Sequence, residues 1–186
     1  MRRAALPFLG LAIALTTSRL ARADEAPPRA SWHPSYLVDS EIHGVFGVGD
    51  AYGPGGGLGA RFTLPVWDHA PFSRLDDTIG LSIGVDWVRY GSYAPPGNGG
   101  DPITSDAFYI PLSLPVDIWL GRVALFVEPA VVWRFTRYDG CVHEVCEPST
   151  RFFPTGFVGA RIKTIDHVAI TIRAGWPLFS LGASWL

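Results

Sequence analysis

The feature that most constrains the fold is an alternation of apolar residues with small or polar ones. In the segment IGLSIGVDWV, residues 79–88, every second residue up to Trp87 is large and apolar, and the residues between are Gly, Ser, Gly and Asp. This period is that of a β-strand, because successive side chains point to opposite faces of a sheet. No window of comparable length has a helical period, so we predict an all-β chain. The alternating segments are eight, at residues 41–49, 57–66, 78–90, 107–119, 122–135, 151–163, 166–175 and 178–186.

A soluble barrel and a membrane barrel share this alternation, but they place the apolar face on opposite sides. The other face here is mostly Gly, Ser and Ala with isolated charges, as at Gly80, Ser82, Gly84 and Asp86. Small side chains fit the narrow lumen of an eight-stranded barrel, whereas a water-exposed face is usually rich in Lys, Glu, Gln and Thr. We therefore predict that the apolar face points outward, in an eight-stranded antiparallel up-and-down transmembrane β-barrel.

The connections between the segments differ in length at the two ends of this barrel. Tight turns are predicted at 120–122 and 164–166, and longer connections at 50–56, 91–106 and 136–150. Short turns at one end and long loops at the other are typical of bacterial outer-membrane barrels. Two connections depart from this pattern: the one at 67–77 is long for the periplasmic end, and the one at 175–177 is short for the outer end. Ten residues tilted by about 45° span about 23 Å, the height of the apolar band of such barrels.

Aromatic residues concentrate near the ends of the predicted strands. In outer-membrane barrels such rings form girdles at the level of the lipid headgroups. The predicted girdle contains Trp87, Trp119, Trp133 and Trp185.

The first residues have the pattern of an export signal. A basic start at Met1-Arg2-Arg3 precedes an apolar run over 4–15, and Ala21-Arg22-Ala23 is a small-residue cleavage site. The run is too short for a membrane-spanning helix. We predict a cleaved signal peptide over 1–23, a periplasmic lead segment over 24–40 and the barrel over 41–186.

The charge pattern excludes two classes of partner. Without the four arginines of the signal peptide, eleven basic residues remain against seventeen acidic ones, a net charge near −6. The single lysine is Lys163, so the chain has no polybasic patch for anionic membrane surfaces or nucleic acid.

The segment YIPLSLPV, residues 109–116, resembles the strand that follows a long surface loop in the small outer-membrane β-barrel proteins of Gram-negative bacteria. The resemblance implies residence in the outer membrane, contact with outer-membrane lipids and recognition of the C-terminal strand by the barrel assembly machinery. These proteins usually end on Phe, whereas this chain ends with Trp185-Leu186.

Charged residues on the inward face are expected to pair inside the lumen, because isolated buried charges are costly. Asp86 is predicted to pair with Arg61, and Glu128 with Arg161 or Arg173. The charges either fill the lumen or line a path for small solutes. They are Glu41, Arg61, Asp86, Asp117, Glu128, Arg134, Arg161 and Arg173.

For function, the sequence favours a non-enzymatic protein with a surface or membrane-stabilising role and a lumen filled by side chains. Only His143, in the connection 136–150, is predicted to reach the outer side, which argues against a catalytic site at the outer rim. We expect no cofactor and no metal. The alternatives are a narrow channel for small or apolar solutes and a soluble periplasmic barrel that binds a hydrophobic ligand.

Cys141 and Cys146 are predicted to form a disulfide in an exported surface loop, because disulfides persist in oxidising compartments. A zinc or copper site that adds His143 and Glu144 is the alternative. Thiol reagents should label intact cells only after reduction. Labelling without reductant would contradict the disulfide.

Overall fold

The computed structural model describes residues 37–50, 53–68, 76–93, 103–140 and 148–186, which all belong to one compact unit, Ser31–Leu186. The predicted signal peptide, most of the lead segment and both cysteines lie outside the described residues. The strands are β1 (Asp39–Asp50), β2 (Gly53–Asp68), β3 (Asp76–Tyr93), β4 (Ile103–Ser113), β5 (Val116–Leu120), β6 (Val123–Asp139), β7 (Ser149–Ile165), β8 (Val168–Gly175) and β9 (Leu178–Trp185).

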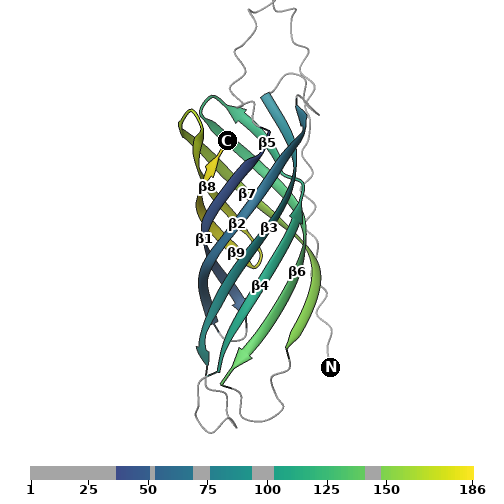
Figure 1. The fold of residues 1–186 in the computed structure, drawn as a ribbon, viewed down its shortest axis with the longest axis vertical. Helices are drawn as coiled ribbons and strands as arrows, with labels where there is room; N and C mark the ends of the chain where they lie inside the picture. Colours follow the sequence, from purple (N-terminus) through teal and green to yellow (C-terminus); the bar gives the residue numbers. More distant parts are fainter. Residues whose placement is uncertain (1–36, 51–52, 69–75, 94–102, 141–147) are drawn as a thin grey trace, which may run out of the picture. The chain divides into compact units, whose positions relative to one another are not determined.

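The strands close into a barrel through antiparallel pairs. β1 pairs with β2 on one side and with β9 on the other, so the first and last strands complete the ring. β4 and β5 both pair with β3 and β6 and therefore occupy one position between them, which makes eight positions from nine strands. Figure 1 shows the strands running obliquely around this ring. The predicted eight-stranded antiparallel barrel is confirmed.

The prediction of one continuous strand over 107–119 is wrong in detail. The strand begins at Ile103, and Leu114-Pro115 interrupts it between β4 and β5. Pro115 has no N–H to donate to a neighbouring strand. Its carbonyl still accepts from the Gly80 N–H at 2.9 Å, and the Leu114 N–H donates to the Pro129 carbonyl at 3.0 Å. The wall of the barrel is therefore continuous across the break.

The two ends of the barrel differ, as expected. At one end, β5 turns into β6 through Gly121, whose φ of 67° suits glycine, and β7 turns into β8 at Asp166-His167. We call this the turn end; the C-terminus lies there, at the top of Figure 1. The opposite end, where β3 gives way to β4 and β6 to β7, is the loop end.

The outer face of the barrel is apolar along its strands. Val127 on β6 is 53% exposed and Leu181 on β9 is 48% exposed, whereas Glu128, next to Val127 on β6, is 1% exposed and faces inward. This confirms the predicted facing. No helix among the described residues is long and apolar enough to cross a membrane.

Three of the four predicted girdle tryptophans, Trp87, Trp133 and Trp185, lie on this outer face. The assignment of Trp119 to the girdle is wrong, because it is only 3% exposed. Trp119 lies two residues after Asp117 on β5 and therefore shares its inward face.

Candidate functional site

The inward-facing side chains form successive levels from the turn end to the loop end. Nearest the turn end is a small group of charges, followed by a larger ion-pair cluster, an apolar layer and a cavity. The ion-pair cluster consists of Glu41, His43, Arg61, Asp86, Glu128 and Arg173.

Glu128 on β6 lies at the centre of the ion-pair cluster. Its Oε2 accepts from Arg173 Nε at 2.8 Å, and its Oε1 accepts from Arg61 Nη1. The Ser113 hydroxyl donates to the same Oε1 at 2.7 Å. One carboxylate thus holds two guanidinium groups from different strands.

Arg173 on β8 also binds Glu41 on β1. Its Nη1 donates to Glu41 Oε1 at 2.7 Å and its Nη2 to Oε2 at 3.1 Å, a bidentate pair. The two residues are far apart in the sequence and meet because β1 and β9 close the ring beside β8. Arg173 therefore links the first strand to the centre of the lumen.

His43 bridges two carboxylates. Its Nδ1 lies 2.9 Å from Glu41 Oε1 and its Nε2 2.8 Å from Asp86 Oδ1. Asp86 in turn lies 3.5 Å from Arg61 Nη2. A protonated imidazole donates from both nitrogens, and in that form the cluster carries three positive and three negative charges.

Gly59 on β2 makes room for the contact between His43 and Asp86. Gly59 is paired with His43 on one side and with Asp86 on the other. A Cβ at Gly59 would lie 2.2 Å from Asp86 Oδ1 and 2.3 Å from His43 Nε2. The side-chain contact therefore requires glycine between the two strands.

The ion-pair cluster is removed from solvent, since each of its six residues is at most 3% exposed. Burial strengthens the attraction between opposite charges but also makes any unpaired charge costly. The arrangement is consistent with a lumen that is filled rather than open.

A second group of charges lies nearer the turn end. Arg161 Nη1 is 2.7 Å from Asp39 Oδ2, and Arg161 Nε is 3.7 Å from Asp117 Oδ1. The sequence predicts that Glu128 pairs with Arg161 or Arg173. In the structure Arg173 pairs with Glu128, and Arg161 pairs with these two aspartates. The ring of Phe126 lies between the two groups, 5.5 Å from Arg161 and 5.3 Å from Arg173.

An apolar layer separates the ion-pair cluster from the loop end. Within it the hydroxyl groups of Tyr90 and Tyr109 are 2.5 Å apart. Arg134, predicted to join the lumen charge network, instead lies over these rings, 5.9 Å from Tyr90 and 5.4 Å from Tyr109. The apolar layer consists of Val45, Val88, Tyr90, Ala107, Tyr109, Ala130, Val132, Phe157 and Leu178.

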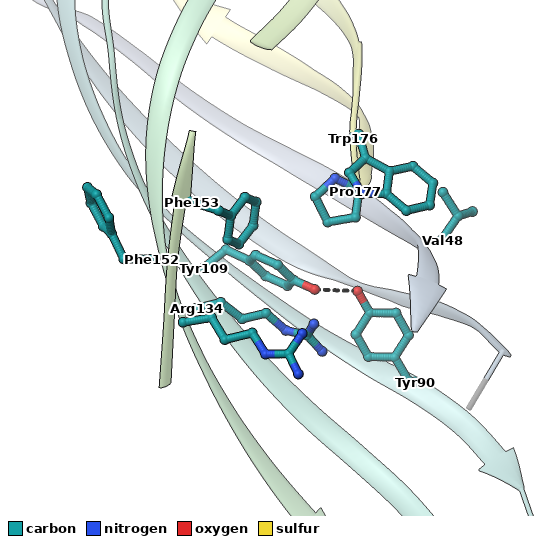
Figure 2. A pocket seen from close by; sticks show the side chains of 9 residues that line it. Val48, Tyr90, Tyr109, Arg134, Phe152, Phe153, Trp176 and Pro177 are labelled. Atoms are coloured by element: carbon teal, nitrogen blue, oxygen red, sulfur yellow. Dashed lines mark hydrogen bonds between the residues drawn. The ribbon is translucent and has the colours of Figure 1, made fainter. Parts of the chain in front are cut away.

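A cavity of about 470 Å³ lies on the loop-end side of the apolar layer. In Figure 2 the bonded tyrosines and Arg134 lie on one side of it, with Trp176 and Pro177 opposite. We call it the loop-end cavity; it is lined by Val48, Tyr90, Tyr109, Arg134, Arg151, Phe152, Phe153, Trp176 and Pro177.

The sequence analysis missed His43 and Asp39 as lumen residues. Both share the odd-numbered, inward face of β1 with Glu41, which was the available signal. His43 lies in the predicted strand 41–49 and Asp39 in the predicted lead segment 24–40, and neither was among the predicted lumen charges. Among the described residues, no group of three or more His, Cys, Asp or Glu side chains could hold a metal ion.

No protein-family model and no curated protein sequence matches the chain. The fold is similar to that of Ail, the attachment invasion locus protein of Yersinia pestis, with a TM-score of 0.53 and 12% identity. Ail in complex with the heparin analogue sucrose octasulfate gives 0.52 and 11%, and both alignments cover 80% of this chain and 96% of Ail. The chain has the fold of a small eight-stranded outer-membrane β-barrel.

Neisserial surface protein A (NspA) is a further similar structure, with a TM-score of 0.48, 14% identity and coverage of 80% of this chain and 94% of NspA. The apolar side chains lie on the outer face of the barrel, and the ion-pair cluster lies in its interior. The fold alone assigns it no binding activity.

Proposed function

We propose that this protein is a non-enzymatic outer-membrane barrel with a closed lumen, whose role lies at the cell surface or in stabilising the membrane. The observation that carries the proposal is the ion-pair cluster, in which Glu128 joins Arg61 and Arg173 across the barrel. The apolar outer face of the barrel favours an environment of outer-membrane lipids and argues against the alternative of a soluble barrel that binds a hydrophobic ligand.

Two consecutive barriers favour a closed lumen over a channel. An ion entering from the turn end would have to separate buried ion pairs, which leaves charges uncompensated in a medium of low dielectric constant. It would then meet the apolar layer, where Val88 and Tyr109 are almost fully buried. Neither barrier offers an ion the continuous polar lining that conduction requires.

The positions of the described histidines support a non-enzymatic role. His43 is held inside the ion-pair cluster, and His167 lies in a turn at the turn end. Neither can act as a general base at the loop end, where a surface-exposed active site would lie.

For export and insertion, we propose that the barrel assembly machinery recognises β9. Trp185 ends this strand, lies on its outer face and is paired with Ser40 of β1. It would take the place of the terminal Phe found in similar proteins.

Purified wild-type protein is expected to give no steady ion conductance in planar bilayers, because the lumen is filled by side chains. The variant Arg137→Gln, which changes a side chain 79% exposed at the loop end, is the control and should behave as the wild type. Stable, ion-selective openings of the wild type would overturn the closed-lumen proposal in favour of a narrow channel.

A further inference from the structure

The wall of the barrel is lower at β8 and β9 than at their neighbours. The last pair between β7 and β8 is Phe157 with Gly175, whereas β7 continues to Ser149. On the other side, the last pair between β9 and β1 is Leu178 with Gly47, and β1 continues to Asp50. The stretch between β7 and β1 at the loop end thus forms a notch in the wall.

The short connection Trp176-Pro177 forms the floor of this notch and is fixed to both of its sides. The Thr155 hydroxyl donates to the Trp176 carbonyl at 2.5 Å, and the Val48 N–H donates to the Pro177 carbonyl at 2.9 Å. The notch is therefore a defined part of the fold.

The loop-end cavity borders the floor of this notch. Trp176 and Pro177, which form the floor, line the cavity, and Trp176 is 63% exposed. The cavity therefore lies directly beside the part of the wall that is lowest.

Aromatic rings flank the outside of the notch. On the β7 side, the rings of Phe152 and Trp133 are 4.9 Å apart, and on the β1 side those of Phe46 and Phe179 are 6.3 Å apart. In an outer-membrane barrel, exposed rings near the strand ends lie at the boundary between acyl chains and headgroups. The notch therefore opens at the level where lipid-like molecules carry their polar heads.

The cavity combines apolar and cationic walls. Phe153, Trp176 and Pro177 supply apolar surface, while Arg134 and Arg151 supply two guanidinium groups. The described residues that line it include no carboxylate. Its volume falls in the range of small-molecule sites.

We propose that the loop-end cavity binds a small amphipathic anion that enters through the notch from the outer leaflet. Its carboxylate or phosphate would accept charge-assisted hydrogen bonds from Arg134 and Arg151. Its apolar part would pack against Phe153 and Trp176. This goes beyond the proposed role of the barrel, which requires no ligand at all.

Equilibrium binding to the wild-type protein in phosphatidylcholine nanodiscs tests the proposal, with empty nanodiscs subtracted. The probes are decanoate, a decanoyl lysophosphatidic acid and, as the neutral control, decanol. Saturable binding of an anion but not of decanol is expected. Binding of decanoate alone identifies a free fatty acid as the source, and binding of the phosphate probe alone identifies a lipid phosphate. Binding of both shows that the site accepts either anionic head group. Binding of neither anion, or of decanol as tightly as the anions, would overturn the proposal.

Variants assign the binding to the cavity. Arg134→Gln is expected to weaken anion binding at least tenfold, whereas Arg137→Gln, on the same strand but facing outward, should leave it unchanged. Because Arg134 touches the apolar layer, Arg151→Gln provides a second test at an exposed side chain and should also weaken binding. Equal affinity of the wild type and both cavity variants would contradict the assignment.

Discussion

Replacing Glu128 with alanine is expected to destabilise the folded barrel by about 3–5 kcal/mol, because it leaves the buried Arg61 and Arg173 without their shared partner. The free energy of unfolding can be measured by denaturant titration in lipid vesicles, followed by tryptophan fluorescence. Glu128→Gln keeps a hydrogen-bond acceptor but removes the charge, and should fall between the wild type and the alanine variant.

The matched control for this change is Asp106→Ala. Asp106, on β4, is also a carboxylate, but the hydrogen bond that it accepts from Trp87 Nε1, at 3.1 Å, is exposed to solvent. Loss of such a bond should cost about 0.5–1.5 kcal/mol. Equal losses at Glu128 and Asp106 would mean that the ion-pair cluster adds no stability.

An arginine in place of Val127 is expected to cost about 2–4 kcal/mol when it faces lipid at the bilayer midplane. Val127 is 53% exposed and lies on β6 between Val123 at the turn end and the outward ring of Trp133. Leu114, 50% exposed beside the break between β4 and β5, should respond in the same way. The measurement is again the free energy of unfolding in vesicles.

Leu120→Arg is the control for depth. Leu120 is 59% exposed, as accessible as Val127, but it ends β5 at the turn end, where an arginine can reach water. It should cost no more than about 1 kcal/mol. If arginine were tolerated equally at both depths, the outer face would not be in contact with a bilayer.

The facing of most side chains could be predicted from the sequence because it depends only on local alternation. Arg61 and Asp86, for example, were expected inside and lie inside. Trp119 was predicted in the girdle because tryptophan is typical of membrane interfaces. Its position two residues after Asp117 indicates the inward face instead.

The pairing of the charges could not be predicted in full, because it depends on how far each strand is shifted against its neighbours. That shift decided that Glu128 meets Arg173 and that Arg161 meets Asp39. The same shift places Arg134 over the rings of Tyr90 and Tyr109, away from the ion-pair cluster. The short connection at 175–177 could be predicted from the sequence, but the loop-end cavity could not, because it depends on how far β7 and β1 extend beyond β8 and β9.

The bond between Glu41 and Arg173 has a consequence for how the ring closes. Glu41 and His43 belong to β1, whereas their partners Arg173 and Asp86 belong to β8 and β3. If β1 slipped by one residue against β9, the Glu41 carboxylate and the His43 imidazole would point toward lipid, and Ile42 would point into the lumen. Arg173 and Asp86 would then be left buried without these partners. The ion-pair cluster thus disfavours closure of the ring with β1 out of register against β9.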